Sequence, residues 1–198
     1  MKEFREAVTV KANPDAPQRQ VRFEVLSQEK TLLMPTPRLR SGFILLDSSV
    51  PRGRLRLASS IRGAFILGKK IPLEKLPKID LVVVGSVAVA QDGARIGKGE
   101  GYSEMEYAIL RELGLVGEST PIITTVHDSQ IVQSVPLEEH DISVDYIVTP
   151  TRVIETKPRR NRPTGIIWNK VNAEMIERMP VLRELRERLG TTRSSAQV

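Results

Sequence analysis

The sequence of 198 residues predicts one α/β domain with three layers, in which helices cover both faces of a mainly parallel sheet. Two observations predict this class. Apolar, β-branched runs typical of buried strands occur at residues 79–90, 121–126 and 144–148. Segments with helix-start signals alternate with these runs. We expect residues 1–171 to form a single domain, followed over 172–198 by a C-terminal helix and a disordered tail.

The first predicted elements are a helix and a buried strand. Asp15, Pro17 and Gln18 together predict a helix start, because Asp can accept from first-turn amides and Gln18 can complete a capping box. The helix should run to about Lys30. Residues 31–34 form a short apolar run that is closed by prolines, which predicts a strand that ends in a loop.

The centre of the chain predicts a strand, a glycine-rich loop and a helix, in that order. Residues 79–90 are nearly continuous apolar residues, as expected for a central parallel strand. The loop at 96–102 follows. Ser103 then opens a helix that should end at Gly114 or Gly117.

The last part of the chain changes in composition. Residues 157–163 (KPRRNRP) predict a stiff basic linker. A final helix is expected over 173–189, bent by Pro180, with its Met, Ile and Leu series facing the core. A disordered tail should begin at Thr191.

Composition limits the function classes. The 30 Lys and Arg residues against 24 Asp and Glu give a formal charge of +6, which favours anionic partners such as nucleotides, a reduced folate, another small anionic substrate, or RNA. The basic residues from Arg52 to Arg62 either contribute to such binding or form a solvated helix face. Aromatic residues make up only 4% of the chain, so stacking platforms for RNA are few.

Other function classes are excluded by what the sequence lacks. The chain has no Cys, which excludes disulfides, thiolate metal sites and cysteine nucleophiles. Its two His residues exclude a His-rich metal site. No run approaches the roughly 20 apolar residues of a membrane-spanning helix, and the start is not signal-like, so we expect a soluble, cytoplasmic protein that does not bind membranes.

The strongest chemical signal is the loop RIGKGEGY, residues 95–102. Alternate glycines leave no Cβ between the backbone and a bound group, so loop amides can approach phosphate oxygens closely. Arg95 and Lys98 add positive charge, and the following helix directs its N-terminal amides to the same place. A glycine-rich turn that only reverses the chain is the alternative. The spacing is neither a Walker A loop nor a dinucleotide fingerprint.

Several motifs together resemble one family. GKGEGY, after the run VVVGSVAV, and EEHDISVD at 138–145 resemble the two signatures of 5-formyltetrahydrofolate cyclo-ligases, also called methenyltetrahydrofolate synthetases. Residues 32–40, 95–102, 126–130 and 145–154 are most similar to a divergent branch, the methenyltetrahydrofolate synthetase domain-containing proteins. The resemblance covers about residues 10–171.

This resemblance implies a cyclo-ligase (NagB/RpiA-like) fold and an ATP- and Mg²⁺-dependent conversion of 5-formyltetrahydrofolate to methenyltetrahydrofolate. By analogy, the nucleotide site would be lined by Arg95, Gly97, Lys98, Gly99, Gly101 and Tyr102. The substrate would contact Pro35, Thr36, Arg38 and Tyr102. The magnesium ligands would be Glu104 and Asp141, since Mg²⁺ prefers a few carboxylates together with phosphate oxygens. The resemblance assigns no catalytic residue.

The chain also departs from the family pattern. Glu100 stands where the enzymes usually carry a Lys, Ser103 replaces a Tyr, and Glu24 matches the formyl-site Glu poorly. No segment upstream of the first motif visibly matches the enzymes' basic N-terminal helix. Two hypotheses therefore remain: a cyclo-ligase-like enzyme, weakened by these changes, or a non-catalytic module that binds nucleotides or RNA. The sequence does not predict the oligomeric state.

Four further residues have a functional and a structural interpretation. His127 and Asp128 either form a pair at the edge of the site, with Asp128 orienting the imidazole, or are structural. For His140 we expect no more than help in positioning its neighbour Asp141. Trp168 fits core packing better than folate stacking.

Overall fold

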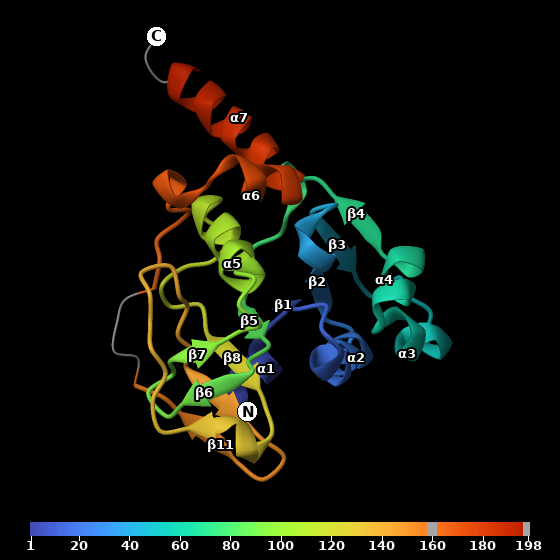
Figure 1. Cartoon of the computed structure of the whole chain (residues 1–198). Helices are drawn as coiled ribbons and strands as arrows, with labels where there is room; N and C mark the ends of the chain where they lie inside the picture. Colours follow the sequence, from blue (N-terminus) through green and yellow to red (C-terminus); the bar gives the residue numbers. More distant parts are fainter. Residues whose placement is uncertain (158–161, 196–198) are drawn as a thin grey trace.

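The computed structural model describes residues 1–157 and 162–195. A mostly parallel eight-stranded sheet forms the centre, in the order β11-β10-β8-β5-β1-β2-β3-β4 (Figure 1). The strands are β1 Thr9–Ala12, β2 Thr31–Pro35, β3 Phe43–Leu46, β4 Lys69–Ile71, β5 Leu81–Val84, β8 Ile122–Thr125, β10 Tyr146–Val148 and β11 Val153–Glu155. The strands from β10 to β2 pair in parallel, whereas β3, β4 and β11 are antiparallel to their neighbours.

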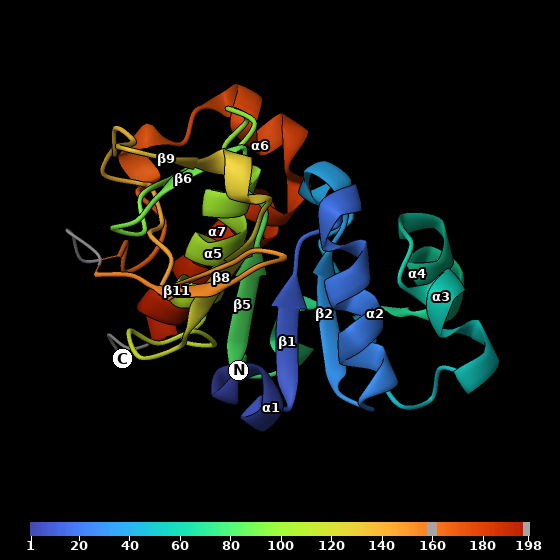
Figure 2. The ribbon, with the colours of Figure 1, turned by 90° about the horizontal axis from the view of Figure 1, so that it is seen from below.

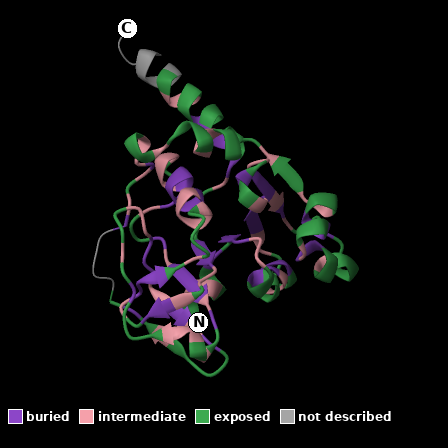
Figure 3. Cartoon of the chain, in the orientation of Figure 1, coloured by how far each residue is buried: buried purple, intermediate pink, exposed green. Residues whose placement is uncertain are grey.

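Helices lie on both faces of this sheet (Figure 2), which confirms the predicted fold class. One face carries α2 Arg19–Ser27, α3 Leu55–Ala58 and α4 Ile61–Leu67, with α1 Lys2–Glu6 at its edge; the other carries α5 Tyr102–Glu112, α6 Ala173–Arg178 and α7 Pro180–Ser195. Alternate strand residues supply the two cores. In β5, Val82 and Val84 belong to the core that also contains residues of α5 and α7, whereas Leu81 and Val83 belong to the core that also contains residues of α2 and α4. The buried residues accordingly follow the strands and the inner faces of the helices (Figure 3).

The prediction of a single strand over 79–90 is wrong, because the chain leaves the main sheet after Val84. Residues Ala88–Ala90 form β6, which pairs with β7 Arg95–Ile96 and β9 Ile131–Val132 in a separate three-stranded sheet. The turn brings the backbone close to the buried Gln18. A Cβ on Gly85 would lie 2.9 Å from Gln18 Oε1, so a side chain at this position would require Gln18 to shift.

The predicted first helix exists, but its start differs. Residues Ala16–Gln18 form a 3₁₀ turn and α2 begins at Arg19, with no side-chain cap from Asp15. The predicted capping box is therefore wrong. Gln18 is buried and donates to Thr125 Oγ1 at 3.3 Å, so tertiary contacts rather than local capping hold this segment. The helix ends at Ser27, three residues before the predicted end.

The C-terminal helices pack on the main core. The predicted bend is a break at Met179, between α6 and α7, and Met179, Leu182 and Leu185 are buried as expected. Helix α7 continues to Ser195, past Thr191 where the disordered tail was predicted to begin; residues 196–198 lie outside the described residues. The domain boundary at 171 stays a prediction. Trp168 packs against the core, half-buried.

The prediction of a basic linker over residues 157–163 is wrong for Arg162. Arg162 is only 6% exposed, lies 2.5 Å from Asp145 and donates to the carbonyl of Ser143 at 3.2 Å. An Arg buried in this way anchors the chain instead of lining a solvated basic surface. Residues 158–161 of the linker lie outside the described residues. No helix in the described part of the chain is long and apolar enough to cross a membrane.

Candidate functional site

A cavity of about 560 Å³ lies at the carboxyl ends of β1 and β5. These strands are parallel neighbours, yet the chain leaves β1 toward α2 on one face and leaves β5 toward α5 on the other. Such a switch point is where open α/β sheets bind ligands. The wall is formed by five residues of 13–18 after β1 (all but Ala16), by 85–87 after β5, by the glycine loop with the start of α5, by Pro37 and Arg38, by Ile61, and by four residues from 136–141.

The glycine loop forms one wall of this cavity, and its role in holding phosphates stays a prediction. Gly99 and Gly101 have φ angles of 82° and 70°, in the left-handed region that favours glycine. Gly101 is the N-cap of α5 and has no side chain to occupy the first-turn amides, so these amides remain available to a ligand. The helix begins at Tyr102, one residue before the predicted Ser103.

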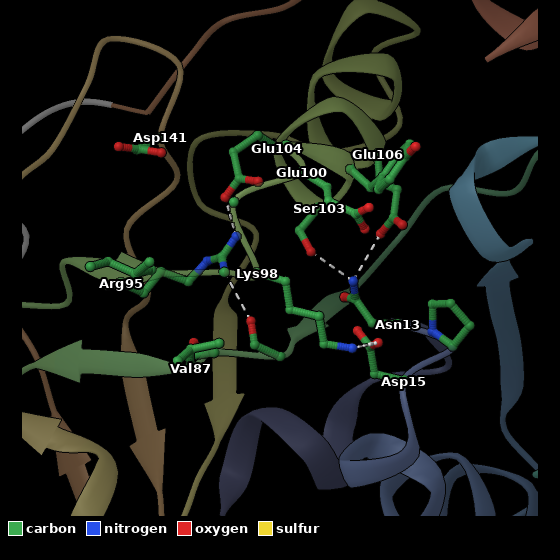
Figure 4. Close-up of a pocket in the computed structure, with 18 of the residues that line it drawn as sticks. Asn13, Asp15, Val87, Arg95, Lys98, Glu100, Ser103, Glu104, Glu106 and Asp141 are labelled. Atoms are coloured by element: carbon green, nitrogen blue, oxygen red, sulfur yellow. Dashed lines mark hydrogen bonds and ion pairs between the residues drawn. The ribbon is translucent and has the colours of Figure 1, made fainter. Parts of the chain in front are cut away.

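Three Lys and Arg side chains of the described residues line the cavity, and each lies near a carboxylate of the same wall. Lys98 Nζ lies 2.6 Å from Asp15 Oδ1, and Arg38 lies 3.9 Å from Glu100. Arg95 pairs with Glu104 (Figure 4). The positive charge that the sequence offers to an anion is therefore already partly neutralised.

Arg95 ties the loop to the end of β5. It is 1% exposed and donates to the carbonyl of Gly85 at 2.9 Å, besides its bond to Glu104. Its predicted role was contact with the nucleotide. In the structure Arg95 lines the cavity together with Gly97, Lys98, Gly99, Gly101 and Tyr102, and its guanidinium also connects elements of the wall.

The floor of the cavity holds a buried network that the sequence analysis missed. Lys11 Nζ donates to Glu106 Oε2 at 2.6 Å and to Asn13 Oδ1 at 2.9 Å. Asn13 Nδ2 in turn donates to Glu106 Oε2 and to Ser103 Oγ, at 3.1 and 2.9 Å. Burial raises the pKa of Glu106 above its ordinary value, and the charge of Lys11 opposes this rise.

One signal in the sequence pointed to this network. Lys11 stands between Val10 and Ala12 in a short apolar strand, and its side chain lies on the α5 face of the sheet. A fully buried Lys is rare without a partner. The partner, Glu106, is 95 residues away in sequence and is reached only through the fold.

The two proposed metal ligands both line the cavity. Glu104 Oε1 is engaged by Arg95, and Asp141 Oδ2 accepts from the Glu138 amide at 2.7 Å, which leaves one oxygen of each carboxylate. Residues 1–157 and 162–195 contain no cluster of three or more His, Asp or Glu that could hold a metal alone. Mg²⁺ usually takes only a few carboxylates and completes its shell with phosphates and water, so Glu104 and Asp141 as its ligands stay a prediction.

The predicted substrate residues divide into two groups. Arg38 and Tyr102 line the cavity. Pro35 and Thr36 are buried and are not part of its lining; Thr36 Oγ1 donates to the Gly42 carbonyl at 3.0 Å and accepts from the Ser41 amide. Glu24, on α2, accepts from Gln20 and is also outside the lining.

The structural interpretation fits His127 and Asp128. His127 Nδ1 caps a 3₁₀ turn through Ser129, and Asp128 accepts from Thr149 and Thr151. Asp128 therefore does not orient the imidazole. The hydroxyl of Thr151 lowers the pKa of Asp128.

His140 lies at the rim of the cavity, as expected for a loop residue. Its Nε2 is 4.0 Å from Asp141 Oδ1 and its Nδ1 is 3.6 Å from Glu138. The contacts fit the expected minor role beside Asp141.

Comparisons with known proteins agree with this architecture. The methenyltetrahydrofolate synthase domain-containing protein of Mus musculus is 50% identical over 191 residues, which cover 93% of this chain and 51% of the relative. The Homo sapiens protein of the same name is 48% identical, with 93% and 50% covered. The chain thus spans about half the length of these relatives.

The fold itself has a solved counterpart. The NMR structure of Aquifex aeolicus 5,10-methenyltetrahydrofolate synthetase superposes with a TM-score of 0.52 at 20% identity, covering 86% of this chain and 82% of that one. The family model described as the 5-formyltetrahydrofolate cyclo-ligase family matches residues 1–150. On these matches and the shared architecture, this chain belongs to the 5-formyltetrahydrofolate cyclo-ligase family.

Proposed function

We propose that the cavity binds ATP with Mg²⁺ and a reduced folate, and that the chain carries a weakened form of 5-formyltetrahydrofolate activation. The observation that carries this proposal is the cavity at the β1/β5 switch point, walled by the glycine loop and the open N-terminus of α5. Its volume of about 560 Å³ lies within the range of small-molecule binding pockets. The relatives at about 50% identity are named for a methenyltetrahydrofolate synthase domain.

The chemistry assigns roles to the wall. The amides from Gly97 to Gly101 and the first turn of α5 would hold the terminal phosphates. Glu104 and Asp141 would hold Mg²⁺, which supplies charge neutralisation between the phosphates. In the proposed reaction the formyl oxygen would attack the terminal phosphorus of ATP and ADP would leave; N10 would then attack the formyl carbon, and phosphate and the N10 proton would leave as the ring closes.

The ion pairs of the cavity's Lys and Arg side chains support a weakened activity. Phosphoryl transfer depends on cations held against the phosphates. Lys98 and Arg38 face Asp15 and Glu100, so a phosphate must compete with these carboxylates. The compartment in which the chain acts, predicted to be the cytoplasm, stays a prediction.

The second candidate is a non-catalytic module for nucleotides or RNA on the same fold. Arg52, Arg54, Arg56 and Arg62 are all exposed on and beside α3 and α4, which leaves them accessible to an anionic polymer. A solvated helix face explains the same exposure. Formation of methenyltetrahydrofolate separates the candidates, since only the enzyme produces it.

A pair of glycine variants tests the nucleotide site. Gly99 and Gly114 both have positive φ, and a Cβ on either meets no atom within 4 Å, so Val strains the backbone similarly at both. ATP at 100 times its Kd should stabilise the native protein by about 2.7 kcal/mol, seen as a rise in Tm. Gly99→Val should lose this rise and Gly114→Val should keep it. An undiminished rise in Gly99→Val discards the site.

A further inference from the structure

The buried network under the cavity fixes the direction of one hydroxyl proton; Figure 4 shows its members Asn13, Ser103 and Glu106 with the bonds that join them. Lys11 can only donate, so the end of the Asn13 amide that faces it must be the oxygen, Oδ1. The other end, Nδ2, therefore faces Ser103 Oγ at 2.9 Å and donates to it. Ser103 must accept this bond, and its own proton has to point elsewhere.

That proton remains available to a ligand. Ser103 is half-buried in the first turn of α5 and lines the cavity. Among the described residues, the Ser103 hydroxyl has one hydrogen bond, which it accepts from Asn13. Glu106 Oε2 already accepts from Lys11 and Asn13, and no hydrogen bond joins Glu106 to the Ser103 hydroxyl among the described residues. The network thus presents a donor to the cavity.

A second donor on the same wall is independent of this network. Arg95 Nε is buried and has no hydrogen-bond partner among the described residues, and Arg95 is 1% exposed. The other unpaired buried atom of the wall, Gln18 Oε1, is an acceptor and lies beside Gly85. Unpaired buried donors favour a ligand with acceptor oxygens.

We propose that Ser103 donates a hydrogen bond to a phosphate oxygen of the bound nucleotide, and that Asn13 is a positioning residue that orients this hydroxyl. Lys11 and Glu106 fix Asn13 and do not touch the ligand. The proposal rests on the proposed nucleotide site. It gives Ser103 a binding role where the sequence comparison showed only the loss of a Tyr.

Titration calorimetry with ATP and Mg²⁺ tests this proposal. Ser103→Ala should weaken binding about tenfold, the effect of losing a hydrogen bond to a charged group, whereas Ser103→Thr keeps the hydroxyl and should stay near the wild type. Ser27→Ala, an exposed Ser on α2, is the matched control and should bind as the wild type does.

A double-mutant cycle tests the role of Asn13. Asn13→Leu should weaken ATP binding in the wild type but add no loss in the Ser103→Ala background, because its effect passes through Ser103. A purely structural Asn13 would weaken both backgrounds equally, which overturns the positioning role. If Asn13→Leu does not fold, the ATP affinities of Ser103→Ala and Ser103→Thr still decide whether the Ser103 hydroxyl binds the nucleotide.

Failure of the proposed function and failure of this inference give different binding results. Wild-type protein that binds no ATP overturns the proposed function and this inference together. Wild-type binding that Ser103→Ala leaves unchanged overturns the inference alone.

Discussion

Lys11→Met should destabilise the protein strongly, and more at high pH than at low pH. Lys11 is fully buried and the side chain of Glu106 is 3% exposed, so the substitution leaves a buried carboxylate without its cation. Removing one partner of a buried ion pair costs about 3–5 kcal/mol. The variant can avoid that loss only by protonating Glu106.

The pH dependence follows from the same burial. A Glu whose pKa is raised in the folded state contributes stability below its unfolded pKa, and this contribution is lost as pH rises toward the folded pKa. Protonating a carboxyl of ordinary pKa 4.5 costs about 0.7 kcal/mol at pH 5 and about 4.8 kcal/mol at pH 8. The deficit of Lys11→Met should therefore be small at pH 5 and approach its full size at pH 8.

Urea unfolding of wild type and variant at pH 5 and pH 8 measures this difference. Lys170→Met removes an exposed cation 2.9 Å from Glu139 and should change the free energy of unfolding by less than about 1 kcal/mol at either pH. Lys11→Met/Glu106→Leu should recover most of the loss, because no unpaired charge remains. A pH-independent deficit in Lys11→Met would refute the reasoning.

Three other predictions concern the ligands. Asp141→Asn should reduce the magnesium dependence of ATP affinity, measured by calorimetry with and without Mg²⁺; full dependence in the variant would remove Asp141 as a ligand. The wild type should form little methenyltetrahydrofolate, followed by its absorbance, and Glu100→Lys should form more because it replaces the anion near Arg38 with a cation; robust wild-type turnover would contradict this. Any RNA binding should weaken steeply with salt, as measured by fluorescence anisotropy, because the exposed Arg side chains act through charge; a salt-insensitive, sequence-selective complex would disprove it.

Local patterns predicted the elements that bury a continuous apolar run. Residues 31–34 and 121–126 form β2 and β8, and the loop before α5 has the predicted position. The pattern failed where an apolar run crosses two sheets, at Gly85, because periodicity does not show where a backbone leaves a sheet. It also failed for β1, whose four residues include Lys11.

The sequence by itself determined the fold class, the glycine loop and the family resemblance, since these depend on residue types at short spacing. The tertiary structure alone decided how the charges are paired. Lys11 and Glu106 are 95 residues apart, and Lys98 lies 83 residues from Asp15. Burial and ion-pair partners determine how readily a side chain ionises. Both are fixed only when segments distant in sequence meet at the ends of β1 and β5.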